Sequence, residues 1–218
     1  MHDDAVRQIE VHATAEDYSS WLLPAVKRVL SAEKLELGAI DIFAVAAGPG
    51  SFTGVRVGLT TVKAWAEIYQ RPVAAVSRLQ ALAEESSGKS PYIGAFFDAR
   101  RSQIFAALYR RDSELRRIED EAVIPPEQFL DWCVTRTGSD SIDWISLQPA
   151  CLTQLRSWSV RQARGETVEQ FSGAVAPRIG QIGLRLAKQG EFTDALHLDA
   201  NYIRRSDAEI FWKGAHGA

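Results

Sequence analysis

A glycine-rich run in the first half of the chain limits the possible folds more than any other sequence feature. The run reads Ala46-Ala47-Gly48-Pro49-Gly50-Ser51-Phe52-Thr53-Gly54-Val55-Arg56-Val57-Gly58-Leu59. An apolar stretch typical of a strand, 40–45, precedes it, and a stretch typical of a helix, 59–69, ends it. A strand, a glycine turn and a helix in this order direct backbone N–H groups and a helix N-terminus at one point. Gly48 and Gly50 permit positive φ here, and Ser51 or Thr53 can cap the helix that follows.

Two interpretations of this loop stay open, an anion-binding turn and a tight structural or docking turn. A nucleotide P-loop closes with Gly-Lys-Ser/Thr, but here the sequence reads Phe52-Thr53-Gly54-Val55-Arg56, without a lysine. The residues themselves therefore favour the structural or docking turn. Arg56 places a positive charge near the N-terminus of the helix, which is unfavourable for the helix dipole. It therefore either pairs with a carboxylate, on a partner or nearby, or is an exposed side chain that the helix tolerates.

Composition and charge narrow the class of protein. The chain has 218 residues, enough for one large domain or two modest lobes, and its net charge of −3 gives no overall basic footprint for nucleic acid. Cys133 and Cys151 lack metal or redox spacing and indicate a reducing compartment. No apolar stretch approaches the roughly 20 residues of a membrane span. We expect a cytoplasmic protein with no membrane association.

The first half predicts alternating strands and helices. The expected elements are a strand at 6–11, a helix at 15–32, a strand at 40–45, a helix at 59–69, a strand at 72–76 and a helix at 79–85. Strands separated by helices at this spacing favour parallel pairing in an α/β sheet.

The pattern changes after the Ser/Gly/Pro-rich break at 86–91. An antiparallel meander is expected from strands at 92–97, 103–109 and 114–123, with a turn at 98–101. A helix at 127–135, a strand at 142–147, a weak helix at 151–158, a strand at 168–171 and a helix at 175–189 follow. We expect a first lobe over 1–89 and a second lobe over 90–218.

The two halves match in element order, which is the arrangement of a two-lobed actin-like (ASKHA, ribonuclease-H-like) α/β fold. In this comparison the first lobe lacks its first two strands, so the strand at 40–45 exposes an unpaired apolar edge. We therefore expect the natural protein to begin about 15–25 residues upstream of Met1, enough for two strands and a turn. An immediate upstream stop codon, together with cooperative folding of the chain as given, would contradict this.

Four segments carry a resemblance to one family. They are the loop 47–58, the helix segment Trp21-Leu22-Leu23-Pro24, the segment Phe97-Asp98-Ala99-Arg100-Arg101 followed by Ile104 and Tyr109, and the closing segment Asn201-Tyr202-Ile203-Arg204-Arg205. Together they span nearly the whole chain and resemble the TsaB (YeaZ) family. Asp98 itself is expected to form the turn.

The resemblance implies a non-catalytic subunit. Such proteins form a heterodimer with the transferase TsaD, and the small ATPase TsaE joins the complex. The complex forms N6-threonylcarbamoyladenosine beside the anticodon of tRNAs that read codons beginning with A. The resemblance thus implies no cofactor or metal, contact with tRNA only through the complex, and a homodimer when the chain is alone.

Two helices have apolar faces wider than one core-facing stripe needs. The residues involved are Tyr18, Trp21, Leu22, Ala25, Val29, Leu59, Val62, Trp65 and Tyr69. These faces pack into the core or bind a partner, and in the family the two helices form the interface with TsaD. The signature loop (Gly48, Pro49, Gly50, Ser51, Phe52, Thr53, Gly54 and Arg56) lies at the start of the second.

The histidines argue against catalysis. The catalytic relative holds a metal through paired histidines on one helix face. Here the four histidines are His2, His12, His197 and His216, and no two are spaced i, i+4. We read all four as surface residues. The alternatives are an actin-fold ATP-dependent transferase or glycopeptidase-like hydrolase, and a tRNA-binding module.

Overall fold

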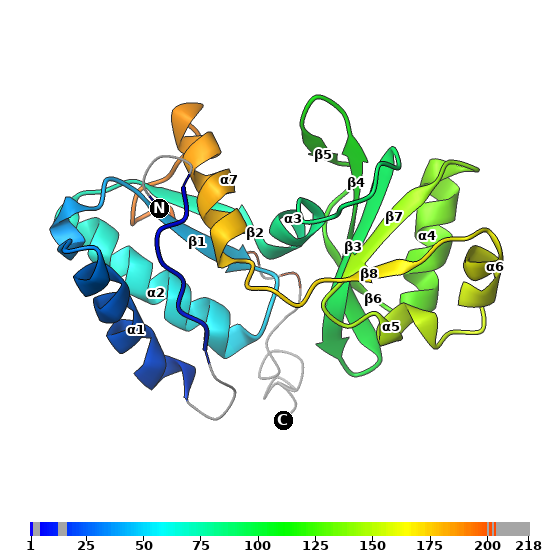
Figure 1. The fold of residues 1–218 in the computed structure, drawn as a ribbon, viewed down its shortest axis with the longest axis horizontal. Coiled ribbons are helices and arrows are strands. Elements are labelled where there is room, and N and C mark those ends of the chain that lie inside the picture. The colour runs from blue at the N-terminus through cyan, green and yellow to red at the C-terminus, as the bar shows by residue number, and fades with distance from the viewer. Residues whose placement is uncertain (2–4, 13–16, 200, 202, 204–218) are drawn as a thin grey trace, which may run out of the picture.

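The computed structural model describes residues 1, 5–12, 17–199, 201 and 203, and it contains two β-sheets with helices packed against them (Figure 1). The small sheet consists of the parallel strands β1 (Phe43–Gly48) and β2 (Val73–Ser77). The large sheet has the order β5-β4-β3-β7-β8, and β6 also pairs with β4. Its strands are β3 (Tyr92–Arg100), β4 (Gln103–Arg111), β5 (Leu115–Arg117), β6 (Ala122–Ile124), β7 (Ile142–Ser146) and β8 (Val168–Gln170). The predicted α/β class is confirmed.

Helices cover both faces of the small sheet. On one face, α2 (Phe52–Tyr69) buries Leu59, Val62 and Ala66 against β1 and β2. On the other face lies α7 (Ala176–Lys188). A Cβ at Gly183 would lie 2.6 Å from the Cβ of Ala44, so glycine allows α7 this close approach. The last helix of the described residues, α7, therefore packs on the small sheet, although sequence alone places it in the second lobe.

The large sheet also has a hydrophobic core on each face. Leu79 and Leu82 of α3 (Arg78–Ala83) pack on one face, beside Ile93 and Phe97. On the other face, α4 (Pro126–Thr137) buries Phe129. The remaining helices are α1 (Tyr18–Ala32), the short 3₁₀ helix η1 (Leu37–Ala39), α5 (Ala150–Thr153) and α6 (Trp158–Ala163).

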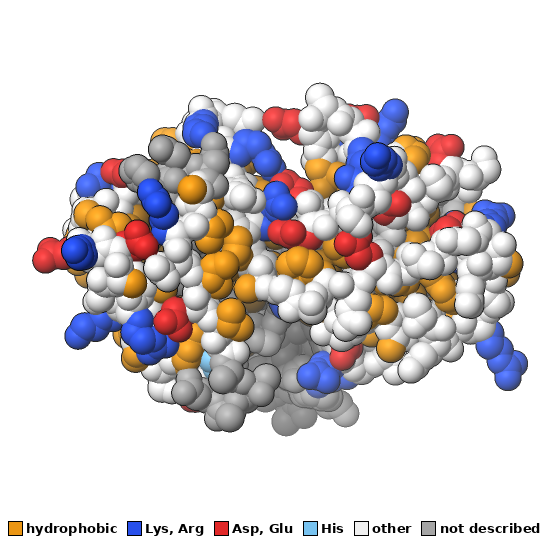
Figure 2. All heavy atoms as spheres, viewed as in Figure 1, with side chains coloured by type: hydrophobic (Ala, Val, Ile, Leu, Met, Phe, Trp, Pro, Cys, Tyr) orange, Lys and Arg blue, Asp and Glu red, His pale blue; other side chains and the backbone are white. Residues whose placement is uncertain are grey.

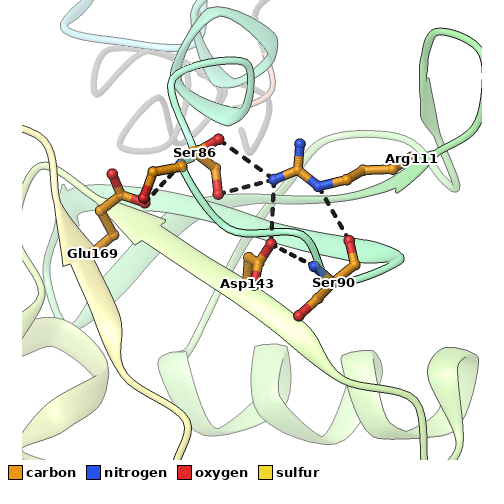
Figure 3. Close-up of polar contacts among 6 residues, drawn as sticks. Ser86, Ser90, Arg111, Asp143 and Glu169 are labelled. Atoms are coloured by element: carbon orange, nitrogen blue, oxygen red, sulfur yellow. Dashed lines mark hydrogen bonds and ion pairs between the residues drawn. The ribbon is translucent and has the colours of Figure 1, made fainter.

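The segment 84–91 joins α3 to the large sheet and is held by polar contacts along its length (Figure 3). Arg111 donates to the carbonyl oxygen of Ser90 (3.1 Å) and to the hydroxyl of Ser86 (3.1 Å). The backbone N–H and hydroxyl of Ser87 both donate to Glu169 (3.0 Å each).

The start of this segment, at 84–85, is held by side chains of α7. Arg178 and Arg185 of α7 form ion pairs with Glu85 (2.9 Å) and Glu84 (2.5 Å). The break that the sequence places at 86–91 is thus a segment with defined contacts to both sheet regions.

The predicted strand at 6–11 is wrong. These residues have no strand assignment, and their side chains contact α1 instead. Gln8 donates to Glu33 (3.2 Å), and Arg28 donates to both carboxylate oxygens of Glu10 (3.2 Å each). Alternation of apolar residues yields a strand only where a neighbouring strand supplies ladder hydrogen bonds.

The predicted third strand of the meander is two strands, β5 and β6. Arg117 pairs with Tyr109 of β4, and Ala122 pairs with Ala106. The chain therefore advances five residues between these two pairs, whereas β4 advances only three. The extra residues form a bulge that interrupts the ladder. The bulge contains Glu121, whose side chain is buried.

Three further boundaries differ from the predictions. The helix expected at 151–158 is divided into α5 and α6, each of which buries a large side chain, Leu152 and Trp158. The hairpin turn expected at 98–101 lies one to two residues later, with positive φ at Arg100, Arg101 and Ser102. The strand expected at 40–45 begins at Phe43, because 37–39 form η1.

Candidate partner-binding face and glycine loop

The glycine loop begins where β1 ends, and Gly48 has φ +117°. The backbone N–H of Asn201 donates to the carbonyl oxygen of Ala47 (2.8 Å). A Cβ at Gly48 would lie 2.9 Å from the carbonyl oxygen of Asn201, too close for a side chain. Position 48 therefore requires glycine for two reasons, its backbone conformation and its contact with residue 201.

The loop is shorter than predicted because α2 begins at Phe52. The Ser51 hydroxyl accepts a hydrogen bond from the Gly54 N–H (3.1 Å), so Ser51 is the N-cap and Thr53 lies inside the helix. Of the two glycines that permit positive φ, Gly48 adopts it and Gly50 does not. The chain changes direction through Gly48 and the extended backbone of Ser51, so Gly50 needs no special conformation.

Two arginines lie beside the loop. Arg56 stacks on the ring of Phe52, one helical turn before it, with 4.0 Å between guanidinium carbon and ring centroid. Arg78 approaches Gly50 and stacks on Phe97 of β3 at 4.5 Å. Burial lowers the pKa of Arg78. Phe52 remains 38% exposed, so the start of α2 presents an aromatic ring to solvent.

The predicted interface residues lie in α1 and α2, which pack side by side (Figure 1), and they differ in burial from exposed to fully buried. Tyr18 and Tyr69 are each 38% exposed. Ala25, Leu59 and Val62 are buried and belong to the core beneath the surface. Trp21, Leu22, Val29 and Trp65 are half-buried. The interpretation as core packing thus holds for part of the set, and the rest is accessible to a partner.

An apolar groove lies between the two helices. It has a volume of about 350 Å³ and is lined by Leu23, Val26, Lys27, Leu30, Ser31, Leu35, Glu36, Leu37 and Trp65. Leu23 and Leu35 are 54% and 46% exposed. Neither is in the predicted set, although the apolar spacing of α1 continues to Leu30 and could have indicated this edge. We call this surface, with Tyr18 and Tyr69, the α1–α2 face.

The α1–α2 face continues into an aromatic cluster at the start of α1. His12 lies 5.1 Å from both Tyr18 and Trp21, measured between ring centroids. His12 is therefore half-buried, whereas His197 is exposed as predicted. His2 and His216 lie outside the described residues. Within the described part of the chain, no group of three or more His, Cys, Asp or Glu is arranged to hold a metal ion.

Asp98 lies in β3, just before the hairpin turn, and its side chain bonds to the backbone at the start of that turn. Its carboxylate accepts a hydrogen bond from the Arg100 N–H (2.7 Å). Of the closing segment 201–205, the structure describes Asn201 and Ile203. Charged side chains of both signs are interspersed over the face shown in Figure 2, without a continuous basic area. Among the described residues, no helix is long and apolar enough to cross a membrane.

Comparison with known proteins gives consistent matches. Residues 9–156 match the family model described as "TsaD: tRNA N6-adenosine threonylcarbamoyltransferase". The tRNA threonylcarbamoyladenosine biosynthesis protein TsaB of Escherichia coli is 33% identical over 92% of this chain and 85% of that protein. The TsaB protein of Bacillus subtilis is 28% identical over 97% of this chain and 90% of that protein. The structure of YeaZ from Pseudomonas aeruginosa aligns with a TM-score of 0.66 and 27% identity, covering 84% of this chain and 83% of that one.

Proposed function

The chain belongs to the TsaB (YeaZ) family, and from this premise we propose that it is a non-catalytic subunit that dimerises with TsaD. Its relatives are named for tRNA threonylcarbamoyladenosine biosynthesis, and the chain has a role in forming this nucleoside. In our proposal TsaD performs the transfer, and this chain supports TsaD through the α1–α2 face. The modified adenosine lies beside the anticodon of tRNAs that read codons beginning with A.

The observation that carries the proposal is the α1–α2 face. Leu23 and Leu35, both about half exposed, flank a groove whose floor includes Trp65. Exposed apolar side chains that line one groove are typical of a protein-binding surface. The glycine loop begins α2, so its geometry sets the direction of one of the two helices.

The sequence supports a non-catalytic role. The four histidines are far apart along the chain, and no two have the i, i+4 spacing that places paired imidazoles on one helix face. We propose no metal and no cofactor for this subunit. TsaE joins the larger complex, tRNA contacts this subunit only through that complex, and the isolated chain self-associates through the α1–α2 face. The complex acts in the cytoplasm.

The finer architecture is part of the same proposal. We propose an actin-like arrangement with lobes at 1–89 and 90–218, in which α7 of the second lobe packs on the small sheet of the first. In this proposal the first lobe lacks the first two strands of the actin-like fold. The outer edge of β1 supports this. The backbone N–H of Phe43 donates to the carbonyl oxygen of Pro72, on the side of β2. Successive residues of a strand direct their backbone groups to alternate edges, so those of Ala44 and Ala46 point to the opposite edge, where no described strand pairs with β1.

Mixing the purified chain with TsaD and separating the mixture by size-exclusion chromatography tests the partner role. We expect a new peak that contains both proteins at equal stoichiometry, and no threonylcarbamoyl transfer or peptide hydrolysis by the chain alone. Two separate peaks would contradict the partner role. Turnover by the isolated chain would favour the transferase or hydrolase instead, and salt-dependent tRNA binding without TsaD would favour an RNA-binding module.

A further inference from the structure

A buried carboxyl group connects the glycine loop to the large sheet. Glu121 lies in the bulge between β5 and β6, and its side chain is 1% exposed. It accepts hydrogen bonds from the hydroxyl of Ser77, the hydroxyl of Tyr109 (3.3 Å) and the side-chain amide of Asn201 (2.7 Å). The guanidinium of Arg117 lies 3.8 Å away. We call these five residues the Glu121 cluster.

Two members of the Glu121 cluster also contact the glycine loop. Ser77, the last residue of β2, is the register partner of Gly48. The backbone of Asn201 donates to Ala47, and its carbonyl oxygen occupies the space beside Gly48. Ser77 and Asn201 are therefore both neighbours of Gly48, and the two oxygens of a single carboxylate bind their side chains.

Such a carboxylate is costly to bury. Removing it from water costs several kcal/mol, which its hydrogen bonds recover only in part, and an apolar side chain of similar size often stabilises a fold as well. Burial raises the pKa of Glu121, although Ser77, Arg117, Tyr109 and Asn201 each oppose that rise. What a carboxylate provides and an apolar group cannot is a fixed direction for each donor.

We propose that Glu121 is a positioning residue, which fixes Gly48 and therefore the first turn of α2 relative to the large sheet. The bulge places the carboxylate, the carboxylate orients Ser77 and Asn201, and both of these residues lie next to Gly48. The direction of α2, and with it one side of the α1–α2 face, then depends on a residue of the other sheet.

A reversal of hydrogen-bond polarity tests the proposal. In Asn201→Asp, a second carboxylate faces Glu121, and we expect amide hydrogen exchange in peptides covering 43–56 to rise about tenfold, the effect of losing one charged hydrogen bond. In Glu121→Gln, the amide of Asn201 can turn to accept from the new donor, so exchange should stay near the wild-type rate. In the double variant the glutamine amide donates to the new aspartate, and exchange should return to within about twofold of wild type.

Controls separate this effect from general loss of structure. Exchange in 126–137, the helix α4, should be unchanged in the Asn201 and Glu121 variants. Glu119→Gln should leave exchange in 43–56 unchanged, since Glu119 binds Arg136 and Trp132 of α4 instead. Unchanged exchange in Asn201→Asp, or a double variant as fast as Asn201→Asp, would overturn the proposal.

If Asn201→Asp does not fold, Asn201→Ala replaces it. We expect faster exchange in 43–56 there too, and no change would count equally against the proposal. This readout does not involve TsaD, so it is independent of the proposed partner role.

Discussion

The guanidinium group of Arg111 lies 3.2 Å from the carboxylate of Asp143, and both side chains also bind the segment 84–91, which joins the two sheet regions (Figure 3). The same carboxylate oxygen accepts from the Ser90 N–H (2.9 Å), and a Cβ at Gly88 would overlap it. Asp143 is 18% exposed, so this is a shielded pair rather than a surface ion pair.

Asp143→Ala should therefore destabilise the chain by about 1–3 kcal/mol, because it leaves a half-buried guanidinium and a backbone N–H without their acceptor. The matched control is Asp112→Ala, whose exposed partners are Arg110 and Arg116, with an expected loss below about 1 kcal/mol. Urea unfolding followed by circular dichroism measures both. Equal losses would mean that the shielded pair contributes no more than the exposed one.

Gly48→Ala should destabilise the chain by about 1–3 kcal/mol, because the position combines positive φ with contact to Asn201. Gly50→Ala is the control, since its φ is not positive and its Cβ would meet side-chain atoms at 3.4 Å. That variant should remain within about 1 kcal/mol of wild type. The same unfolding assay measures the difference, and a well-tolerated alanine at position 48 would contradict the described loop geometry.

Glu121 should make stability depend on pH. Because burial raises its pKa in the folded state, its favourable contribution is complete below the ordinary carboxyl pKa and is lost as the pH rises through the raised value. The stability of wild type relative to Glu121→Gln should therefore fall as the pH rises above the ordinary carboxyl pKa of about 4. Glu119 provides the opposite sign, because the hydrogen bond from Arg136 lowers its pKa. Wild type relative to Glu119→Gln should lose stability as the pH falls, and identical profiles for the two variants would refute the prediction.

The two thiols should react at different rates. Cys133 is fully buried and burial raises its pKa strongly, whereas Cys151 is only partly buried. Because the thiolate is the reactive form, Ellman's reagent should label Cys151 first and Cys133 only after unfolding. Cys133→Ser and Cys151→Ser identify the two phases. Rapid labelling of Cys133 in the folded chain would show that α4 opens readily.

Much of the fold could be predicted from local patterns. Hydrophobic spacing placed α1, α2 and α7, and the turn chemistry of Gly48 and Ser51 placed the loop. The errors arose where a distant contact decides the conformation. Residues 6–11 alternate like a strand but pair with no described strand, and the bulge between β5 and β6 contains Glu121, whose side chain is buried among distant residues.

In the candidate site, too, local sequence patterns predicted some features and distant contacts decided the others. The spacing of α1 and α2 indicated apolar faces, but spacing alone cannot separate Leu59, which is buried, from Tyr69, which is exposed. Glu121 follows Glu119 and Asp120 in a charged stretch, and nothing local marks it as buried. Its role depends on Ser77 and Asn201, which are 44 and 80 residues away in the sequence.

The most direct measurement of the central claim is the affinity of TsaD for variants of the α1–α2 face. Leu23→Asp and Leu35→Asp place charges in the apolar groove and should each weaken binding at least about tenfold in isothermal titration calorimetry. Val134→Asp and Val160→Asp alter similarly exposed apolar side chains on α4 and α6, and should bind TsaD like wild type. Undiminished binding by both groove variants, or equal weakening by the controls, would contradict the claim that the α1–α2 face binds TsaD.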